Sequence, residues 1–179
     1  MAESPYLLRF IQLPVGIHEF SYTIDGNFFR ERENSIIQNA VIQVDVVLHK
    51  ANTAMQLELS ITGEVDVECV RCLESFSMPI DIEKQLVVRM VDHPENEDDD
   101  DDAIYIAKSA HEIELSNTLY DFISLEVPYS PVHPQTEEGE DGCDPEVLRH
   151  LQQPAPPASD EKPAEGDDRW AALRKIKLN

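Results

Sequence analysis

Four residues of this sequence carry side chains suited to holding a metal ion, and two of them are closely spaced cysteines. Cys69 and Cys72 lie in the stretch Glu-Cys-Val-Arg-Cys-Leu-Glu. A turn with this spacing places both sulfurs on one side, within reach of one tetrahedral zinc ion. A closed structural site needs two more ligands, so we predict a zinc cofactor held by Cys69, Cys72, Cys143 and His133. Asp144 or water in place of His133 would leave an open position suited to chemistry.

Alternating apolar and polar residues on both sides of these cysteines predict two strands joined by a hairpin. The apolar positions are Leu57, Leu59, Ile61, Val65 and Val67 before the turn, and Phe76, Met78, Ile80 and Ile82 after it. Gly63 interrupts the first pattern and predicts a bulge. Because no helix follows Cys72, the helix dipole that activates a redox Cys-x-x-Cys is missing, which favours metal binding. Three reduced thiols without a metal, with His133 exposed in a loop, stay an open alternative.

The chain is strongly acidic. Its 179 residues include 14 Lys+Arg and 36 Asp+Glu, which gives a net charge of −22 at pH 7. Such a polyanion avoids nucleic acid unless basic residues are gathered locally, so basic proteins are easier partners. The odd number of cysteines favours a reducing compartment, and the sequence shows neither a signal peptide nor a membrane-spanning stretch. We therefore predict a cytoplasmic protein without a membrane partner.

Further alternating segments, at 20–24 and 42–48, predict additional strands, and residues 118–127 predict one helix that Pro128 ends. The helix has one apolar face, formed by Leu119, Phe122, Ile123 and Val127, which we expect to pack on the sheet. The fold class is therefore α+β: a mostly antiparallel sheet, curled toward a barrel, with one covering helix, a Cys-x-x-Cys hairpin tip and a tethered C-terminal helix. The first strands could equally pair with the last.

Composition divides the chain into three parts. We predict one α+β domain over residues 1–151, a disordered linker over 152–166 and a short basic helix over 167–179. An acidic loop at about 92–102 contains five consecutive aspartates, Asp98 to Asp102, whose mutual repulsion keeps it extended. The terminal segment carries the single tryptophan and the densest basic cluster, so it either packs on its own domain or binds a partner. The candidate partner-binding residues are Arg169, Trp170, Leu173, Arg174, Lys175 and Lys177.

Three stretches in this order carry a family resemblance. They are residues 63–76 around the two cysteines, residues 112–133 with Glu-Ile-Glu-Leu, Val-Pro and Pro-Val-His-Pro, then Cys143, and the terminal Asp-Arg-Trp-Ala-Ala-Leu-Arg-Lys-Ile-Lys. The order resembles the YceD family, the large ribosomal RNA subunit accumulation proteins of bacteria and plastids. Asp168 stands where that pattern often has a proline, and the run Asp98 to Asp102 is not part of the pattern. The resemblance implies a role in large-subunit ribosomal RNA accumulation, with components of the large ribosomal subunit as partners and no established enzymatic activity.

We therefore predict a non-catalytic factor in ribosomal RNA accumulation and ribosome assembly that binds a ribosomal particle or a ribosomal protein. One alternative is an acidic, chaperone-like interaction protein for basic clients, whose affinity would fall steeply with salt. A second alternative is a zinc or thiol enzyme. Against it, the sequence shows no carboxylate–histidine pairing, no glycine-rich phosphate loop and no nucleophile motif, so we predict no catalytic residue and no small-molecule substrate.

Overall fold

The computed structural model describes residues 5–52, 54–96, 102–135 and 142–152. These fall into two compact units, one running through Cys143 and one starting at Asp144. The predicted linker and terminal helix lie outside the described residues, apart from Gln152. Of the five consecutive aspartates, Asp98 to Asp102, only Asp102 belongs to the described residues.

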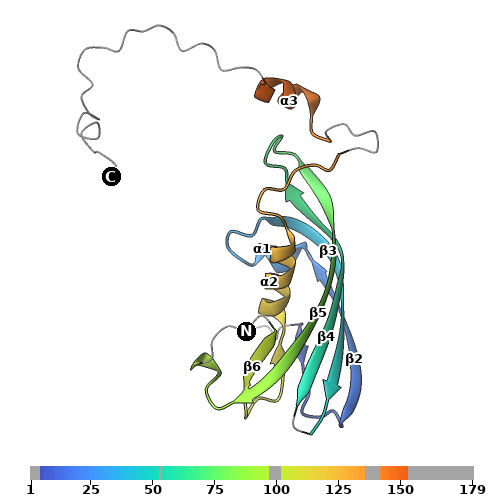
Figure 1. Ribbon diagram of the computed structural model, residues 1–179, viewed down its shortest axis with the longest axis vertical. Helices are drawn as coiled ribbons and strands as arrows, with labels where there is room; N and C mark the ends of the chain where they lie inside the picture. Colours follow the sequence, from blue (N-terminus) through green and yellow to red (C-terminus); the bar gives the residue numbers. More distant parts are fainter. Residues whose placement is uncertain (1–4, 53, 97–101, 136–141, 153–179) are drawn as a thin grey trace, which may run out of the picture. The chain divides into compact units, whose positions relative to one another are not determined.

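A five-stranded sheet forms the body of the first unit (Figure 1). Its strands, in spatial order, are β2 (Gly16–Asp25), β3 (Ile37–Lys50), β4 (Met55–Glu68), β5 (Ser75–Val91) and β6 (Ala103–Ala107). All neighbours are antiparallel except β5 and β6, which run parallel. A small second sheet pairs β1 (Leu7–Leu8) with β7 (Ile113–Glu114), so the first strand does pair with the last. The predicted α+β class and the mostly antiparallel sheet are confirmed.

The expected curl toward a barrel is wrong, because the main sheet stays open with β2 and β6 at its two edges. Closing a barrel requires strands whose register shifts steadily around the sheet. Here β3, β4 and β5 lie side by side with little stagger, since Lys50 pairs with Met55 and Met55 pairs with Val88. The strand at the far edge, β6, has only five residues and pairs with the end of β5 alone.

One face of the sheet is covered by α2 (Ser116–Glu126) instead of by further strands (Figure 1). Leu119 and Ile123 of this helix are fully buried, as its apolar face predicts. The helix begins two residues earlier than expected because the Glu114 carboxylate accepts the backbone N–H of Ser116 at 2.8 Å. It ends at Glu126, two residues before Pro128, whose ring prevents a further helical turn.

Three shorter helical segments complete the described chain: α1 (Gly26–Arg30), the 3-10 helix η1 (Pro94–Asn96) and α3 (Pro145–Gln152). Asp25 caps α1 by accepting the N–H of Asn27 at 3.0 Å. The helix α3 belongs to the second unit, and it begins at Pro145, a residue whose fixed φ suits the first position of a helix. Among the described residues, no helix combines the length and apolar character needed to cross a bilayer.

Strand pairing continues through Gly63, so the predicted bulge is wrong at this position. Gly63 pairs with Ile42 on one side and Ile80 on the other, and the register shifts only between Ile37 and Asn39. A side chain at Gly63 would collide with the Val41 carbonyl oxygen and lie 2.7 Å from the Ile42 Cα. The backbone φ of 154° at Gly63 also disfavours other residues. The glycine therefore marks a close approach of two strands, which interrupts the apolar pattern without interrupting the ladder.

Candidate metal centre

The turn between β4 and β5 holds Cys69 and Cys72 at the tip of the longest hairpin. The ladder ends with the pair Glu68 and Ser75. Beyond it, the Cys69 N–H donates to the Glu74 carbonyl and the Leu73 N–H donates to the Cys69 carbonyl, both at 2.9 Å. These two bonds close the turn, and both cysteine side chains are buried. The hairpin position predicted for the Cys-x-x-Cys is therefore observed.

The chain after α2 returns to this turn and carries His133. Prolines at 128, 131 and 134 keep it from forming a helix. The Val70 N–H donates to the Pro131 carbonyl at 2.9 Å, which ties the returning segment to the hairpin tip. The His133 ring then lies against Phe76, with 4.7 Å between the ring centroids. This contact, together with the backbone bond, orients the imidazole toward the cysteines.

Gly142 allows the next residue, Cys143, to lie beside His133 and the two hairpin cysteines. A Cβ on Gly142 would collide with the Pro134 carbonyl oxygen and lie 3.2 Å from the His133 Cβ. Only a glycine therefore lets the backbone before Cys143 pass this close to the His133 segment. Sequence reasoning missed this positioning role, although a glycine directly before a candidate ligand was a signal for it.

The four predicted ligand residues lie together. Their ligand atoms, three Sγ atoms and one imidazole nitrogen, are all within 4.8 Å of one another. Cys69 Sγ lies 3.6 Å from Cys143 Sγ, and His133 Nδ1 lies 3.3 Å from Cys72 Sγ and 3.7 Å from Cys143 Sγ. A tetrahedral zinc ion, with Zn–S of ~2.3 Å and Zn–N of ~2.0 Å, places two sulfurs about 3.8 Å apart and a sulfur and a nitrogen about 3.5 Å apart. These three distances are close to the corresponding edges of that tetrahedron.

The cysteines are three free thiols, so no disulfide accounts for their proximity. Burial raises the pKa of the Cys69 thiol. Hydrogen bonds to the thiolate outweigh this effect and lower the pKa to about 6; they come from the backbone of Cys72, Arg71 and His133 and from the His133 side chain. For Cys143, burial and then the neighbouring Cys69 and Cys72 raise the pKa to about 11. Cys69 therefore favours the thiolate form, while Cys143 beside it resists a second negative charge. A divalent cation at the centre would remove that opposition, because metal-bound thiols lose their protons.

The predicted alternative ligand, Asp144, has another role. Its carboxylate accepts the Glu146 N–H at 2.8 Å at the start of α3. The group of four residues already supplies the number and types of ligand found in a closed zinc site, three sulfurs and one nitrogen. The arrangement can thus hold one metal ion and leaves no protein-ligand position open.

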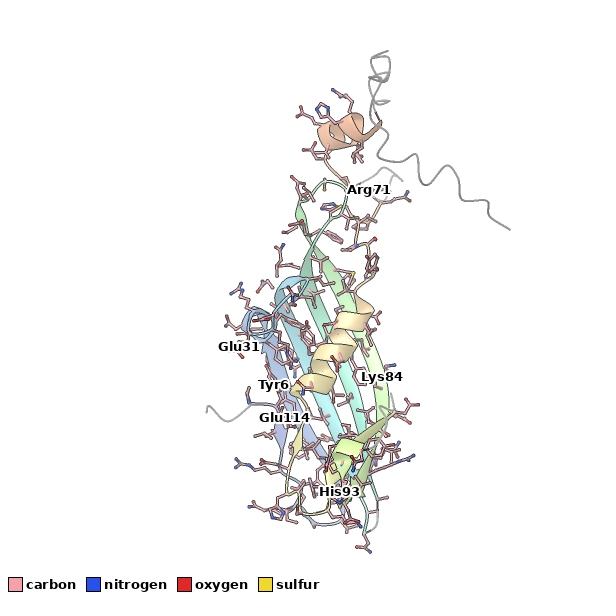
Figure 2. The ribbon with its side chains drawn as sticks, turned by 90° about the vertical axis from the view of Figure 1, so that its left-hand side faces the viewer. Tyr6, Glu31, Arg71, Lys84, His93 and Glu114 are labelled. Atoms are coloured by element: carbon pink, nitrogen blue, oxygen red, sulfur yellow. The ribbon has the colours of Figure 1, made fainter. Side chains whose placement is uncertain are left out.

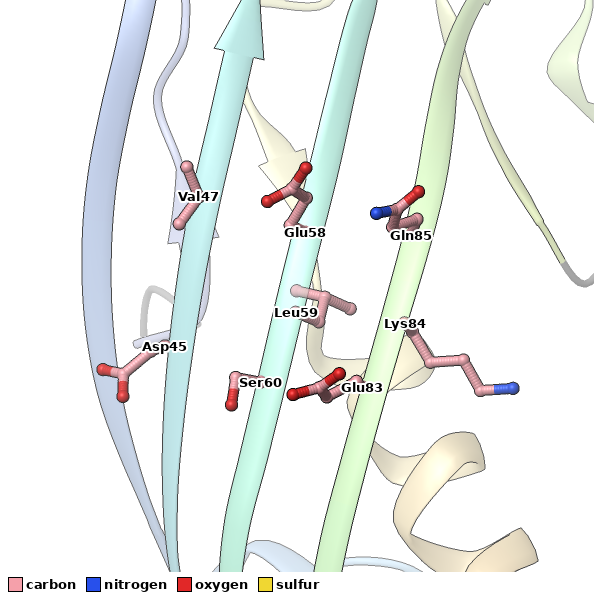
Figure 3. A pocket seen from close by; sticks show the side chains of 8 residues that line it. All are labelled: Asp45, Val47, Glu58, Leu59, Ser60, Glu83, Lys84 and Gln85. Carbon is pink, nitrogen blue, oxygen red and sulfur yellow. The ribbon is translucent and has the colours of Figure 1, made fainter.

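A second polar region lies on the uncovered face of the main sheet. It is a shallow hollow lined by Asp45, Val47, Glu58, Leu59, Ser60, Glu83, Lys84 and Gln85. Figure 3 shows Lys84 pointing away from the carboxylates of Glu58 and Glu83. The Lys84 ammonium instead lies 5.5 Å from the centre of the Phe122 ring on α2. The hollow therefore presents three carboxylates to solvent, and no cysteine or histidine lines it.

The remaining candidate site residues, Arg169, Trp170, Leu173, Arg174, Lys175 and Lys177, lie outside the described residues. Their role in partner binding stays a prediction.

In a comparison with protein families, residues 57–177 match the model described as "Large ribosomal RNA subunit accumulation protein YceD". This range covers more than half of the 179 residues. The chain belongs to the YceD family. Membership implies a role in the accumulation of large ribosomal subunit RNA, as the resemblance of the three sequence stretches indicated. The region matched to YceD contains all four residues of the candidate metal centre, and it also includes the terminal basic segment.

No curated protein and no solved structure matches the chain. The YceD assignment therefore rests on the family match, and the geometry of the centre comes from this structure alone.

Proposed function

We propose that this protein is a non-catalytic factor in large-subunit ribosomal RNA accumulation that acts by binding a ribosomal particle or a ribosomal protein. The observation that carries the proposal is the YceD family match over residues 57–177. The acidic composition supports a basic partner on the ribosome, because opposite charges accelerate encounter and suppress wrong partners.

We also propose that Cys69, Cys72, His133 and Cys143 hold one zinc ion as a structural site. Support comes from the match between the observed distances and a tetrahedron, and from the burial of the three cysteines. Such an ion would join the hairpin tip to His133 and to Cys143, which lie on either side of residues 136–141 in the sequence. Four protein ligands leave no position for a reactive water, which supports a structural role over a catalytic one.

The absence of enzymatic activity is likewise a proposal. It is supported by the closed ligand set of the candidate metal centre, in which four protein side chains occupy the four positions of a structural site. The competing thiol-enzyme hypothesis has one observation in its favour, the lowered pKa of Cys69, but that side chain is fully buried. Reactive cysteines are partially exposed.

The test of the proposed function uses cells in which the gene is deleted and then supplied at graded expression levels. We expect the ratio of large- to small-subunit ribosomal RNA to fall without the protein and to recover in proportion to the amount supplied. The protein should sediment with large-subunit particles. Full recovery at a protein level far below the number of particles would support an enzyme instead, and an unchanged ratio after deletion would contradict the proposal.

The chaperone-like alternative is favoured by the three carboxylates that line the hollow, of which one, Glu58, lies 3.4 Å from His49 Nε2. Two unrelated basic proteins, lysozyme and cytochrome c, serve as probes for it. Binding to both with similar affinity, lost as salt rises, would support a general client-binding role. Binding to large-subunit particles but not to these probes would support the specific role on the ribosome.

A further inference from the structure

Leu73, the residue after the second cysteine of the turn, occupies an unfavourable position in two respects. Its φ of 62° lies in the left-handed region, which disfavours residues with a Cβ. Its side chain is also 69% exposed, so it gains little from burial within this chain. A glycine or asparagine would relieve the backbone and remove the exposed apolar side chain. A strained, exposed leucine is therefore better explained by a contact with another molecule than by folding.

Two further exposed apolar side chains come from this turn and from the segment that is hydrogen-bonded to it. Val70, which directly follows Cys69, is 53% exposed, and its N–H bonds to the Pro131 carbonyl. Val132 follows Pro131 directly and is 39% exposed. We call Val70, Leu73 and Val132 the tip surface. Because hydrogen bonds close the turn and tie it to the returning chain, these side chains are presented on a rigid support, which lowers the entropy cost of binding.

Acidic residues lie at both ends of the turn and along the strand that leads into it. Glu68 and Glu74 flank the turn, and Glu64 and Asp66 continue the negative charge along β4. Glu64 accepts the Ser77 hydroxyl at 3.1 Å and Asp66 accepts the Asn39 amide at 3.2 Å, so their hydrogen-bond donors are neutral. Within the described part of the chain, no ion pair joins any of these four carboxylates to a cation.

One cation, Arg71, lies in the turn itself, at the tip of the hairpin in Figure 2. Four carboxylates against this single guanidinium leave the surroundings of the tip surface negative. That charge repels the phosphate backbone of RNA and attracts a partner rich in lysine and arginine. An apolar centre with a charged rim is also the arrangement typical of protein–protein interfaces.

We propose that the tip surface docks on a basic protein of the large ribosomal subunit, with Leu73 inserted against an apolar side chain and the surrounding carboxylates facing the partner's cations. This inference rests on the proposed function and names the partner class and the surface that binds it. Leu73 is the expected anchor, because it is the most exposed of the three side chains and its N–H bonds to the Cys69 carbonyl, which holds its backbone in place.

The test compares the full-length chain with Leu73→Asn and with the control Ile17→Asn. Ile17 is similarly exposed, at 63%, but it pairs with His49 at the end of the sheet far from the turn. Asparagine tolerates the left-handed region, so Leu73→Asn should unfold at the same or a higher temperature than the wild type. Thermal unfolding and zinc content check that both variants are intact.

Binding is measured to three probes: purified large-subunit particles, the total protein extracted from them, and their deproteinised ribosomal RNA. We expect Leu73→Asn to weaken binding to the particles and to the extracted protein about tenfold or more, with no change in the RNA measurement. Ile17→Asn should bind as the wild type does. Replacing Glu68 and Glu74 by glutamine should slow association and reduce its dependence on salt.

The outcomes separate this inference from the proposed function. If the wild type binds the particles and Leu73→Asn binds them equally well, the docking surface is wrong while the function stands. If Leu73→Asn weakened binding to the RNA probe alone, the proposal that the partner is a protein would also be wrong. If the wild type binds no probe and deletion leaves the ribosomal RNA ratio unchanged, both the function and the inference are wrong.

Discussion

The hairpin tip and the hollow of the sheet both gather ionisable side chains, but they do so in opposite ways. At the tip, three buried cysteines and a histidine bring their ligand atoms within 4.8 Å of one another. In the hollow, Asp45, Glu58 and Glu83 stand on three different strands and face solvent. Exposed carboxylates keep their hydration and need no counter-ion, whereas buried thiolates at contact distance do. In this protein, burial and contact between the ligand atoms together distinguish the candidate metal centre from the hollow.

The largest expected effect comes from removing two ligands with Cys69→Ser and Cys72→Ser together. We expect about one zinc ion per wild-type chain and none in the variant. The free energy of unfolding should fall by about 4 kcal/mol when free zinc exceeds the dissociation constant a thousandfold. Elemental analysis and thermal unfolding of protein purified without a polyhistidine tag provide the measurements.

The matched control neutralises the hollow with Asp45→Asn, Glu58→Gln and Glu83→Gln. We expect unchanged zinc content and a stability change within about 0.5 kcal/mol, since these are exposed surface groups. A well-folded wild type without metal would show that the two regions do not differ in the proposed way. Equal loss of stability in both variants would have the same consequence.

Substitution of a single ligand, His133, also tests the difference between the candidate metal centre and the hollow. His133→Ala should weaken zinc binding by more than about a hundredfold, because even the loss of a residue that only supports a ligand typically costs 10- to 100-fold. His133→Cys should retain the ion, since four cysteines are a common structural zinc set. Competition with a chromophoric chelator measures both affinities. Equal zinc affinity of His133→Ala and the wild type would show that His133 is not a ligand and would support an open site.

The pH dependence follows from the two shifted cysteines. With its pKa raised to about 11, Cys143 is protonated at neutral pH in the metal-free protein and must release that proton on binding. Cys69, with its pKa lowered to about 6, is already mostly thiolate at neutral pH and takes up a proton only as the pH falls through that value. Zinc affinity should therefore rise about tenfold per pH unit above pH 6 from Cys143 alone, and more steeply below it.

The same competition assay, repeated between about pH 5 and about pH 8, gives this slope. An affinity independent of pH would contradict thiolate coordination by Cys143. The hollow variant again serves as the control, because its substitutions leave the cysteines and their hydrogen bonds in place and should leave the slope unchanged.

Sequence patterns predicted those features that depend on local chemistry. The strands around Cys69 and Cys72 alternate with a period of two, and the apolar face at Leu119 and Ile123 repeats with helical spacing. The grouping of the two hairpin cysteines with Cys143 and His133 was predictable for a similar reason, since metal coordination restricts the types of residue. A closed site also requires four ligands, which three cysteines and one nearby histidine supply.

Features that depend on distant backbone segments were not predictable in this way. The open sheet results from the register of β3, β4 and β5, which no single strand encodes. Gly63 was read as a bulge, although it is required by the approach of Val41 from the neighbouring strand. The parallel pairing of β6 depends equally on where the chain returns after residues 97–101.

Gly142 offers the smallest and most specific test, because it changes the position of a ligand without removing one. A Cβ at this position would meet the Pro134 carbonyl and the His133 Cβ, so Gly142→Ala should push Cys143 away from the other ligands. We expect about tenfold weaker zinc binding, since misplacing a ligand costs about as much as losing its supporting partner. The control Gly16→Ala places its Cβ where no atom lies within 4 Å, far along the chain from the centre, and it should leave zinc affinity unchanged even if its φ of 148° costs some stability. Equal zinc affinity in Gly142→Ala and the wild type would mean that the chain before Cys143 can move aside. In that case the centre would be assembled by the metal itself rather than held ready by the backbone.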